Sequence, residues 1–164
     1  MADVANSKLL QIGDIRNFKD VLVVLVKTEW NADVVDELEK GCVKILHQYG
    51  VNTATIIVPG AIEIPFAIQQ TWANYNAPSA FVALGCIVRG GTPHFDYVCQ
   101  SVTSGITQLN ILLPVPVIFG VLTVDNDQQA KDRIGGAHGH KGEEAAITAI
   151  KMIILNQQLK EGKL

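Results

Sequence analysis

Runs of apolar residues alternate with helical apolar patterns along most of the chain. The first run, Val21–Val26, is rich in β-branched residues and is typical of a strand buried on both faces of a sheet. From Asp33 the apolar positions recur at helical spacing as far as Tyr49, with Asn31 as the expected cap and Gly50 as the expected stop. Together these segments predict one strand-to-helix unit.

The same alternation continues to the end of the sequence. We expect strands at 53–58, 80–88 and 116–122, and helices at 64–75, 94–112, 127–134 and 142–160. Strands that alternate with helices imply right-handed crossovers, so the pattern predicts a doubly wound α/β fold with a four-stranded parallel core sheet and helices on both faces. Residues 1–164 are expected to form one domain. Within the N-terminal extension 1–17, the segment Lys8–Gly13 is expected to be an extra strand that pairs with a neighbouring subunit.

Composition supports one core and excludes two classes of partner. Of the 164 residues, 48% are hydrophobic and 18% are charged, which is enough apolar material for a single domain. The net charge of −3 and the lack of a basic cluster argue against nucleic-acid binding. No charged residue lies between Tyr97 and Val124, but polar residues interrupt that region too often for a membrane span. We therefore expect the region to be buried, in part against another subunit.

Cysteine usage and the N-terminal segment favour a cytoplasmic location. The three cysteines are odd in number, have no C-x-x-C spacing and lie within apolar patterns, where free thiols behave as small hydrophobic groups. Residues 1–17 mix polar side chains with short apolar pairs and lack the core of a signal peptide. A reducing compartment is expected.

The segment Leu84–Tyr97 carries the strongest chemical signal. A predicted strand leads into Gly90-Gly91-Thr92, and successive backbone N–H groups in such a turn can bind an anion. His94 follows within one turn, and histidine exchanges protons readily near neutral pH. Gly91 stands where a P-loop has its lysine, which argues against a nucleoside triphosphate site. The segment predicts an anion site beside an acid–base group.

Other strand ends carry polar or aromatic residues as well. They are Thr28–Asn31, Pro59–Glu63, Arg89–His94 and Phe119–Asp125. Because ligands in open parallel sheets bind beyond the carboxyl ends of the strands, these ends are expected to build one pocket. A second glycine cluster, Gly135–Gly142, does not have the G-x-G-x-x-G spacing and predicts no dinucleotide site.

Four blocks in this order resemble the 6,7-dimethyl-8-ribityllumazine synthase family. The blocks are P-G-A-I-E-I-P from Pro59, A-L-G-C-I-V-R-G-G-T-P-H-F-D-Y-V-C from Ala83, P-V-I-F-G-V-L-T from Pro116 and K-G-E-E-A-A from Lys141, with Trp30-Asn31 ahead of them. The resemblance implies a flavodoxin-like three-layer fold. It also implies a transferase that condenses 5-amino-6-(D-ribitylamino)uracil with L-3,4-dihydroxy-2-butanone 4-phosphate, releasing phosphate and water, in the penultimate step of riboflavin biosynthesis. No metal and no cofactor are implied.

The resemblance further implies which residues form the site. The pyrimidine and ribityl groups would be bound by Trp30, Asn31, Ala61, Ile62, Glu63, Cys86, Ile87, Val88, Phe119 and Lys141. The phosphate would be bound by Gly91, Thr92 and Arg133. His94 would move protons and Arg133 would act with it in catalysis. Phe119, Arg133 and Lys141 would come from the adjacent subunit, so the complete site would exist only in the oligomer.

Members of this family form pentamers, pairs of pentamers or icosahedral sixty-subunit shells. No insertion separates Arg133 from Lys141, which permits a homopentamer or a shell. The implied partners are the small-molecule substrates, further copies of the chain and riboflavin synthase, with no nucleic acid and no membrane. The chain departs from the common pattern at Gly91, where alanine is frequent, at Trp30, where phenylalanine is commoner, and at His138 and His140.

Other interpretations of these residues stay open. Trp30 could pack in a core or interface, Glu63 could complement a helix dipole, and His94 could be structural. His138 and His140 invite a metal hypothesis, but no further ligands lie at the spacing that a closed site needs. A non-catalytic flavin or lumazine carrier or shell protein is an alternative function, although it has no use for a base beside a phosphate site. A phosphosugar isomerase would leave Trp30 without a role.

Overall fold

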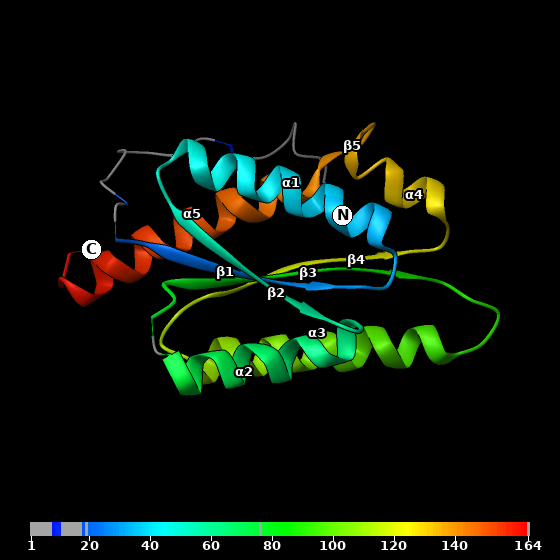
Figure 1. The fold of residues 1–164 in the computed structure, drawn as a ribbon, viewed down its shortest axis with the longest axis horizontal. Helices are drawn as coiled ribbons and strands as arrows, with labels where there is room; N and C mark the ends of the chain where they lie inside the picture. Colours follow the sequence, from blue (N-terminus) through cyan, green and yellow to red (C-terminus); the bar gives the residue numbers. More distant parts are fainter. Residues whose placement is uncertain (1–7, 11–17, 19, 76, 164) are drawn as a thin grey trace.

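The structure, a computed structural model, describes residues 8–10, 18, 20–75 and 77–163. It has three layers, with a central sheet between α1 and α5 on one face and α2 and α3 on the other (Figure 1). The strand order is β2-β1-β3-β4, and every neighbouring pair is parallel. The predicted doubly wound α/β sheet is therefore confirmed.

The main elements agree closely with those expected from the apolar pattern. The strands are β1 (Leu22–Thr28), β2 (Asn52–Val58), β3 (Ala80–Val88) and β4 (Val117–Val124). The long helices are α1 (Ala32–Gln48), α2 (Ile64–Tyr75), α3 (His94–Leu112) and α5 (Lys141–Lys160). A short 3₁₀ turn, η2 (Ala61–Glu63), precedes α2.

Two apolar clusters, one on each face of the sheet, form the core. One cluster joins the sheet to α1 and α5, with Leu38 and Ile150 fully buried. The other joins the sheet to α2 and α3, with Ile64 and Ile106 buried. The central strands β1 and β3 contribute to both clusters, as their uninterrupted apolar sequences predict. The edge strand β2 is largely exposed.

Helix α1 ends as the sequence predicts but begins differently. Gly50 has φ +72°, its N–H donates to the His47 carbonyl at 3.0 Å, and the Val51 N–H donates to the Leu46 carbonyl at 3.0 Å. This is a Schellman ending, which favours glycine. Asn31 occupies the cap position, but its side chain caps no helix N–H. The predicted side-chain cap is wrong, because that amide bonds to another strand.

The region after β4 departs from the predicted helix over 127–134. Helix α4 (Asp127–Lys131) is shorter, and the hairpin β5 (Ile134–Gly136) and β6 (Gly139–His140) follows it. Gly135 and Gly139 have φ values of +113° and +76°, which glycine adopts without a steric penalty. The helix ends at Lys131, before the predicted end at residue 134, and the two glycines allow the hairpin that follows.

Two further expectations concern contacts between subunits. Lys8–Leu10 form a bend and turn and not a strand, while the rest of the expected strand at Lys8–Gly13 lies outside the described residues. In the single chain the outer face of α3 is open, with Tyr97, Ile111 and Leu112 70%, 79% and 74% exposed, so the expected burial of this face against another subunit stays a prediction. Within the described residues, no helix is both long enough and apolar enough to cross a membrane.

Candidate active site

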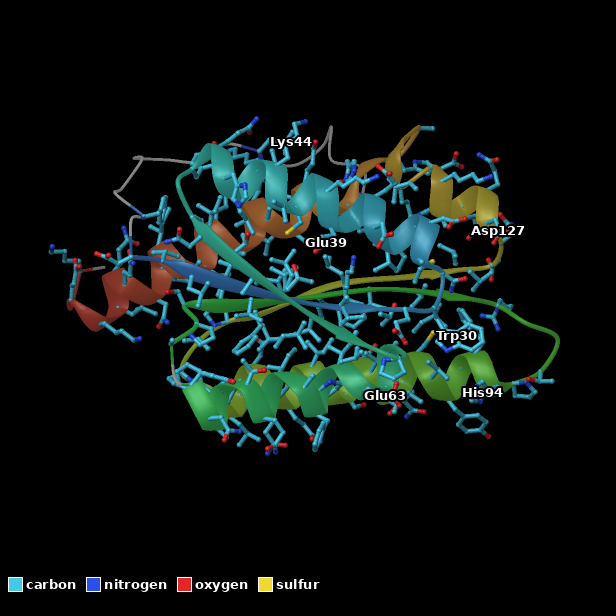
Figure 2. The ribbon with its side chains drawn as sticks, in the orientation of Figure 1. Trp30, Glu39, Lys44, Glu63, His94 and Asp127 are labelled. Carbon is cyan, nitrogen blue, oxygen red and sulfur yellow. The ribbon has the colours of Figure 1, made fainter. Side chains whose placement is uncertain are left out.

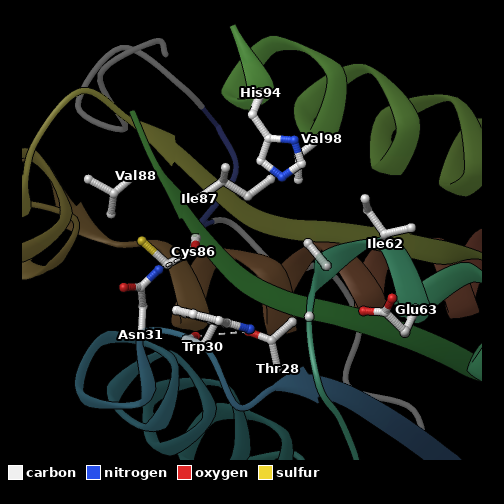
Figure 3. Close-up of a pocket in the computed structure, with 12 residues that line it drawn as sticks. Thr28, Trp30, Asn31, Ile62, Glu63, Cys86, Ile87, Val88, His94 and Val98 are labelled. Carbon is white, nitrogen blue, oxygen red and sulfur yellow. Dashed lines mark hydrogen bonds between the residues drawn. The ribbon is translucent and has the colours of Figure 1, made fainter. Parts of the chain in front are cut away.

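A cavity of about 400 Å³ opens at the carboxyl ends of β1, β2 and β3, beside the start of α3 (Figure 3). It is lined by Thr28, Trp30, Asn31, Gly60, Ala61, Ile62, Glu63, Cys86, Ile87, Val88, His94 and Val98. Three of the four strand ends that the sequence singles out therefore meet in one pocket. The fourth end, Phe119–Asp125, does not line it.

Parallel pairing brings Trp30 and Glu63 to the same edge of the sheet. The pairing of β1 with β2 continues beyond the strands, since the Glu29 N–H donates to the Val58 carbonyl at 2.9 Å. Trp30 is 73% exposed, so a large aromatic surface is available to a ligand. Figure 2 shows Trp30, Glu63 and His94 at the same end of the molecule. An aromatic ring, a carboxylate and an imidazole thus converge on one opening.

Asn31 links the loop after β1 to β3. Its φ of +57° makes it the only residue other than glycine with positive φ in the described part of the chain. Its side-chain Nδ2 donates to the Cys86 carbonyl at 2.7 Å. Asparagine tolerates this left-handed conformation better than most residues. The bond fixes the backbone beside Trp30 and occupies one acceptor site on a pocket carbonyl.

We expect Asn31→Ala to be less stable than Asn31→Gly. Both variants lose the bond to the Cys86 carbonyl, worth about 1 kcal/mol. Alanine also holds the left-handed conformation at a cost of about 1–2 kcal/mol, which exceeds the entropy cost of about 0.5–1 kcal/mol for glycine. Urea unfolding should therefore give the alanine variant a free energy of unfolding about 0.5–1 kcal/mol below that of the glycine variant. Equal or reversed stabilities would contradict this account of Asn31.

Gly60 and Thr28 support the pocket, as their place in two of the predicted strand ends indicates, although neither is among the residues that the resemblance implies. A Cβ at Gly60 would lie 3.0 Å from Glu63 Oε2 and 3.6 Å from Trp30 Cδ1, so glycine leaves room for both side chains. Thr28 is buried, and its hydroxyl donates to the Trp30 carbonyl at 3.2 Å. Val98 lines the opposite wall. In the sequence, the P-G turn pointed to Gly60, and the position of Val98 one helical turn after His94 pointed to Val98.

The Cys86 thiol lies in the pocket but is poorly suited to act as a nucleophile. Burial, followed by the charge of Asp127, raises the pKa of Cys86 to about 11. Because the thiolate is the reactive form, the thiol is largely unreactive at neutral pH. This agrees with the expectation that the free thiols behave as small hydrophobic groups.

The anion turn lies next to the pocket but does not line it. Gly91 and Thr92 are exposed, and the Thr92 hydroxyl accepts a bond of 3.4 Å from the His94 N–H. His94 is the first residue of α3 and lines the cavity. The turn and the base are therefore adjacent, as predicted, but only the base lines the cavity.

Phe119, Lys141 and Arg133 lie away from this cavity within the chain. Phe119 and Lys141 line a second cavity of about 600 Å³ along β4 and α5. The Lys141 ammonium is buried and donates to both oxygens of Glu144, at 2.7 and 2.9 Å. Arg133 lines neither cavity, and its Nη1 donates to the Gln129 carbonyl at 2.7 Å. One chain thus holds the residues implied by the resemblance in separate places.

The two histidines of the H-x-H pattern also have separate environments. His138 is exposed, whereas the His140 ring occupies the space beside Gly41 of α1. His140 Nδ1 accepts a bond of 3.4 Å from the Glu143 N–H and so caps α5. His140 therefore has a role in helix packing and capping.

Comparison with known proteins matches most of the chain. The family model described as 6,7-dimethyl-8-ribityllumazine synthase matches residues 20–157. A protein of that name from Porphyromonas gingivalis is 49% identical, over 82% of this chain and 84% of its own length. Those from Parabacteroides distasonis and Cytophaga hutchinsonii are 47% and 45% identical, over 79% and 86% of this chain and 82% and 90% of their own lengths. The chain belongs to the 6,7-dimethyl-8-ribityllumazine synthase family.

Proposed function

We propose that the chain is a transferase that condenses 5-amino-6-(D-ribitylamino)uracil with L-3,4-dihydroxy-2-butanone 4-phosphate. The products are 6,7-dimethyl-8-ribityllumazine, phosphate and water, in the penultimate step of riboflavin biosynthesis. Membership of the family supports this reaction. The observation that carries it is the convergence of exposed Trp30, Glu63 and His94 on one pocket at three parallel strand ends.

The pyrimidine substrate fits the wall of the pocket formed by β1, β2 and β3. Trp30 stacks on the ring, with Asn31 beside it, and the backbone groups of Cys86–Val88 bond to the edge of the ring. The Glu63 carboxylate accepts bonds from ribityl hydroxyls, and Ala61 and Ile62 line the chain of the ribityl group. A flat heteroaromatic ring with a polyol tail matches an exposed aromatic side chain near a carboxylate.

The phosphate substrate fits the start of α3. The backbone N–H groups of Gly91 and Thr92 lie at the N-terminus of this long helix, where an anion is stabilised. Arg133 adds a planar guanidinium that can bind phosphate through two parallel bonds. The leaving phosphate would then be held from two sides.

The chemistry is a sequence of proton transfers that His94 can serve. The 5-amino group attacks the ketone and loses water to form an imine. Loss of a proton from the next carbon expels phosphate and leaves an enol, which tautomerises to a methyl ketone. The ribitylamino nitrogen closes the ring on that ketone with loss of a second water. His94 accepts and returns protons in these steps, and holding two reactive molecules side by side supplies much of the rate.

The complete site needs a neighbouring subunit. Phe119, Lys141 and Arg133 do not line the pocket of their own chain, so they would complete the pocket of the next copy. The exposed apolar residues Ile111 and Leu112 on α3 support such packing. We propose a homopentamer, which can assemble further into a sixty-subunit icosahedral capsid, in the cytoplasm and with riboflavin synthase as a partner.

Mixing the two substrates with the protein tests the reaction. We expect lumazine fluorescence and free phosphate to appear together, in equal amounts, well above the rate without protein. A lumazine carrier would bind added product but release no phosphate, and equal rates with and without protein would refute the enzyme. Sedimentation of the same sample should give the mass of a pentamer or a multiple of it.

A further inference from the structure

Arg89 connects three elements beside the pocket and has no role in the proposed reaction. It directly follows β3, and its backbone N–H donates to the Val124 carbonyl at 2.9 Å, so the sheet pairing extends to it. Its Nε donates to Asp125 Oδ1 at 2.9 Å and its Nη1 donates to Asp96 Oδ1 at 3.2 Å. The guanidinium carbon lies 4.1 Å from the centroid of the Phe95 ring. One side chain thus joins the end of β4 to the first turn of α3.

These contacts reach the residues that immediately follow His94. Phe95 and Asp96 belong to the same helical turn as His94, so fixing them fixes the backbone that carries the imidazole. No side chain caps α3 at Pro93. On the sheet side, Asp125 is anchored in turn, since its backbone N–H donates to Gln129 Oε1 at 2.9 Å. The first turn of α3 is therefore tethered to the sheet through Arg89.

We propose that Arg89 is a positioning residue for the reaction: its bonds to Asp96 and Asp125 and its stacking on Phe95 set the place of His94 above the bound substrates. This inference rests on the proposed function. Arg89 acts through the first turn of α3 and does not touch the substrates. Arginine suits this task because its planar group can donate in two directions and stack on a ring at once.

The charges around Arg89 argue against direct phosphate binding by this residue. Two carboxylates already share the guanidinium, and the bond from Arg89 lowers the pKa of Asp125, which therefore stays ionised at neutral pH. An ionised carboxylate beside the guanidinium repels a phosphate. The two roles predict opposite effects of Asp125→Asn: a phosphate-binding Arg89 would bind phosphate more tightly in this variant, whereas a positioning Arg89 would lose part of its hold on α3.

The test compares Arg89→Gln, Arg89→Lys and Asp125→Asn with wild type and with Lys40→Gln, in the assembled oligomer. Lys40 pairs with Glu37 on the exposed side of α1 and is a matched control for losing a surface ion pair. The kcat, the KM for the phosphate substrate and inhibition by inorganic phosphate are measured. We expect kcat to fall about tenfold in Arg89→Gln, which corresponds to about 1.4 kcal/mol of barrier. The KM and the inhibition should stay within about twofold.

The conservative variants separate positioning from folding. Arg89→Lys should keep more of kcat than Arg89→Gln, because an ammonium retains one ion pair but loses the fork and the stacking. Asp125→Asn should also lower kcat, and Lys40→Gln should match wild type. If Arg89→Gln fails to assemble, the kcat values of Arg89→Lys and Asp125→Asn decide whether Arg89 is a positioning residue. A raised KM or weaker phosphate inhibition at unchanged kcat would overturn the proposal, as would wild-type values throughout. Inactive wild-type protein would refute the proposed function and this inference together.

Discussion

Replacing His94 by alanine is expected to slow lumazine formation by about 10²–10⁴-fold at saturating substrate, the usual range for one acid–base group. The lower end is the closer expectation, because binding two reactive molecules side by side supplies part of the rate. Stability should hardly change. His94 is exposed at the first position of α3, so its truncation leaves no cavity and should alter the free energy of unfolding by less than about 0.5 kcal/mol.

Initial rates of fluorescence and of phosphate release measure the effect, and urea unfolding measures stability. His94→Gln is the sharper variant, since glutamine keeps hydrogen bonds but cannot carry a proton at neutral pH. His47→Ala is the matched control, because His47 is an exposed histidine on α1 that bonds to Thr53. Full activity of His94→Gln across the pH range would show that His94 is not the proton carrier.

Replacing Gly142 by alanine should have the largest effect on stability, with a loss of about 3 kcal/mol or more. A Cβ at Gly142 would lie 2.0 Å from the Leu38 carbonyl oxygen and 2.8 Å from the Leu38 carbonyl carbon. These are backbone atoms on the buried face of α1 and cannot rotate away, so α1 and α5 would have to separate. Overpacking of a close-packed interior costs about 1–3 kcal/mol, and more when the backbone must move.

Urea and thermal unfolding of a graded set of variants check this expectation. Gly41→Ala meets the His140 ring, which is a side chain that can rotate, so its loss should be smaller. Gly90→Ala is the control, because nothing lies within 4 Å of an added Cβ there. If Gly142→Ala were as stable as Gly90→Ala, the close crossing of α1 and α5 would not exist in solution.

Local sequence patterns predicted the elements well where one signal dominated. The apolar run at Val21–Val26 is typical only of a buried strand, and Gly50 supplied the positive φ that ends α1. The hairpin after α4 was missed because its strands are only three and two residues long and rich in glycine, so no alternating apolar pattern marks them. The φ values of Gly135 and Gly139 show the turn. The close crossing at Gly142 joins segments far apart in sequence, which no local pattern records.

The candidate site was partly predictable for a similar reason. The ends of parallel strands meet at one edge, so the convergence of Trp30, Glu63 and His94 followed from the order of elements. The bond from Asn31 to Cys86 joins residues far apart in sequence and accompanies a left-handed backbone at Asn31, and neither was foreseen. The roles of Arg133 and Lys141 came from resemblance alone. The strand-end argument placed Phe119 in the pocket of its own chain, which is wrong because Phe119 lies near the start of β4 and not at its carboxyl end.

The strand order β2-β1-β3-β4 has a consequence for how the pocket can change. The chain leaves β1 toward α1 on one face and leaves the neighbouring β3 toward α3 on the other (Figure 1). Because these two adjacent loops diverge, a crevice lies between them. It forms without any gap in the packing of the core. The floor of the crevice is still shared with the two apolar clusters, since Cys86 belongs to one and Ile87 to the other. Substitutions at its exposed lining residues, such as Trp30 and Ile62, can therefore change the ligand while the layers keep their packing.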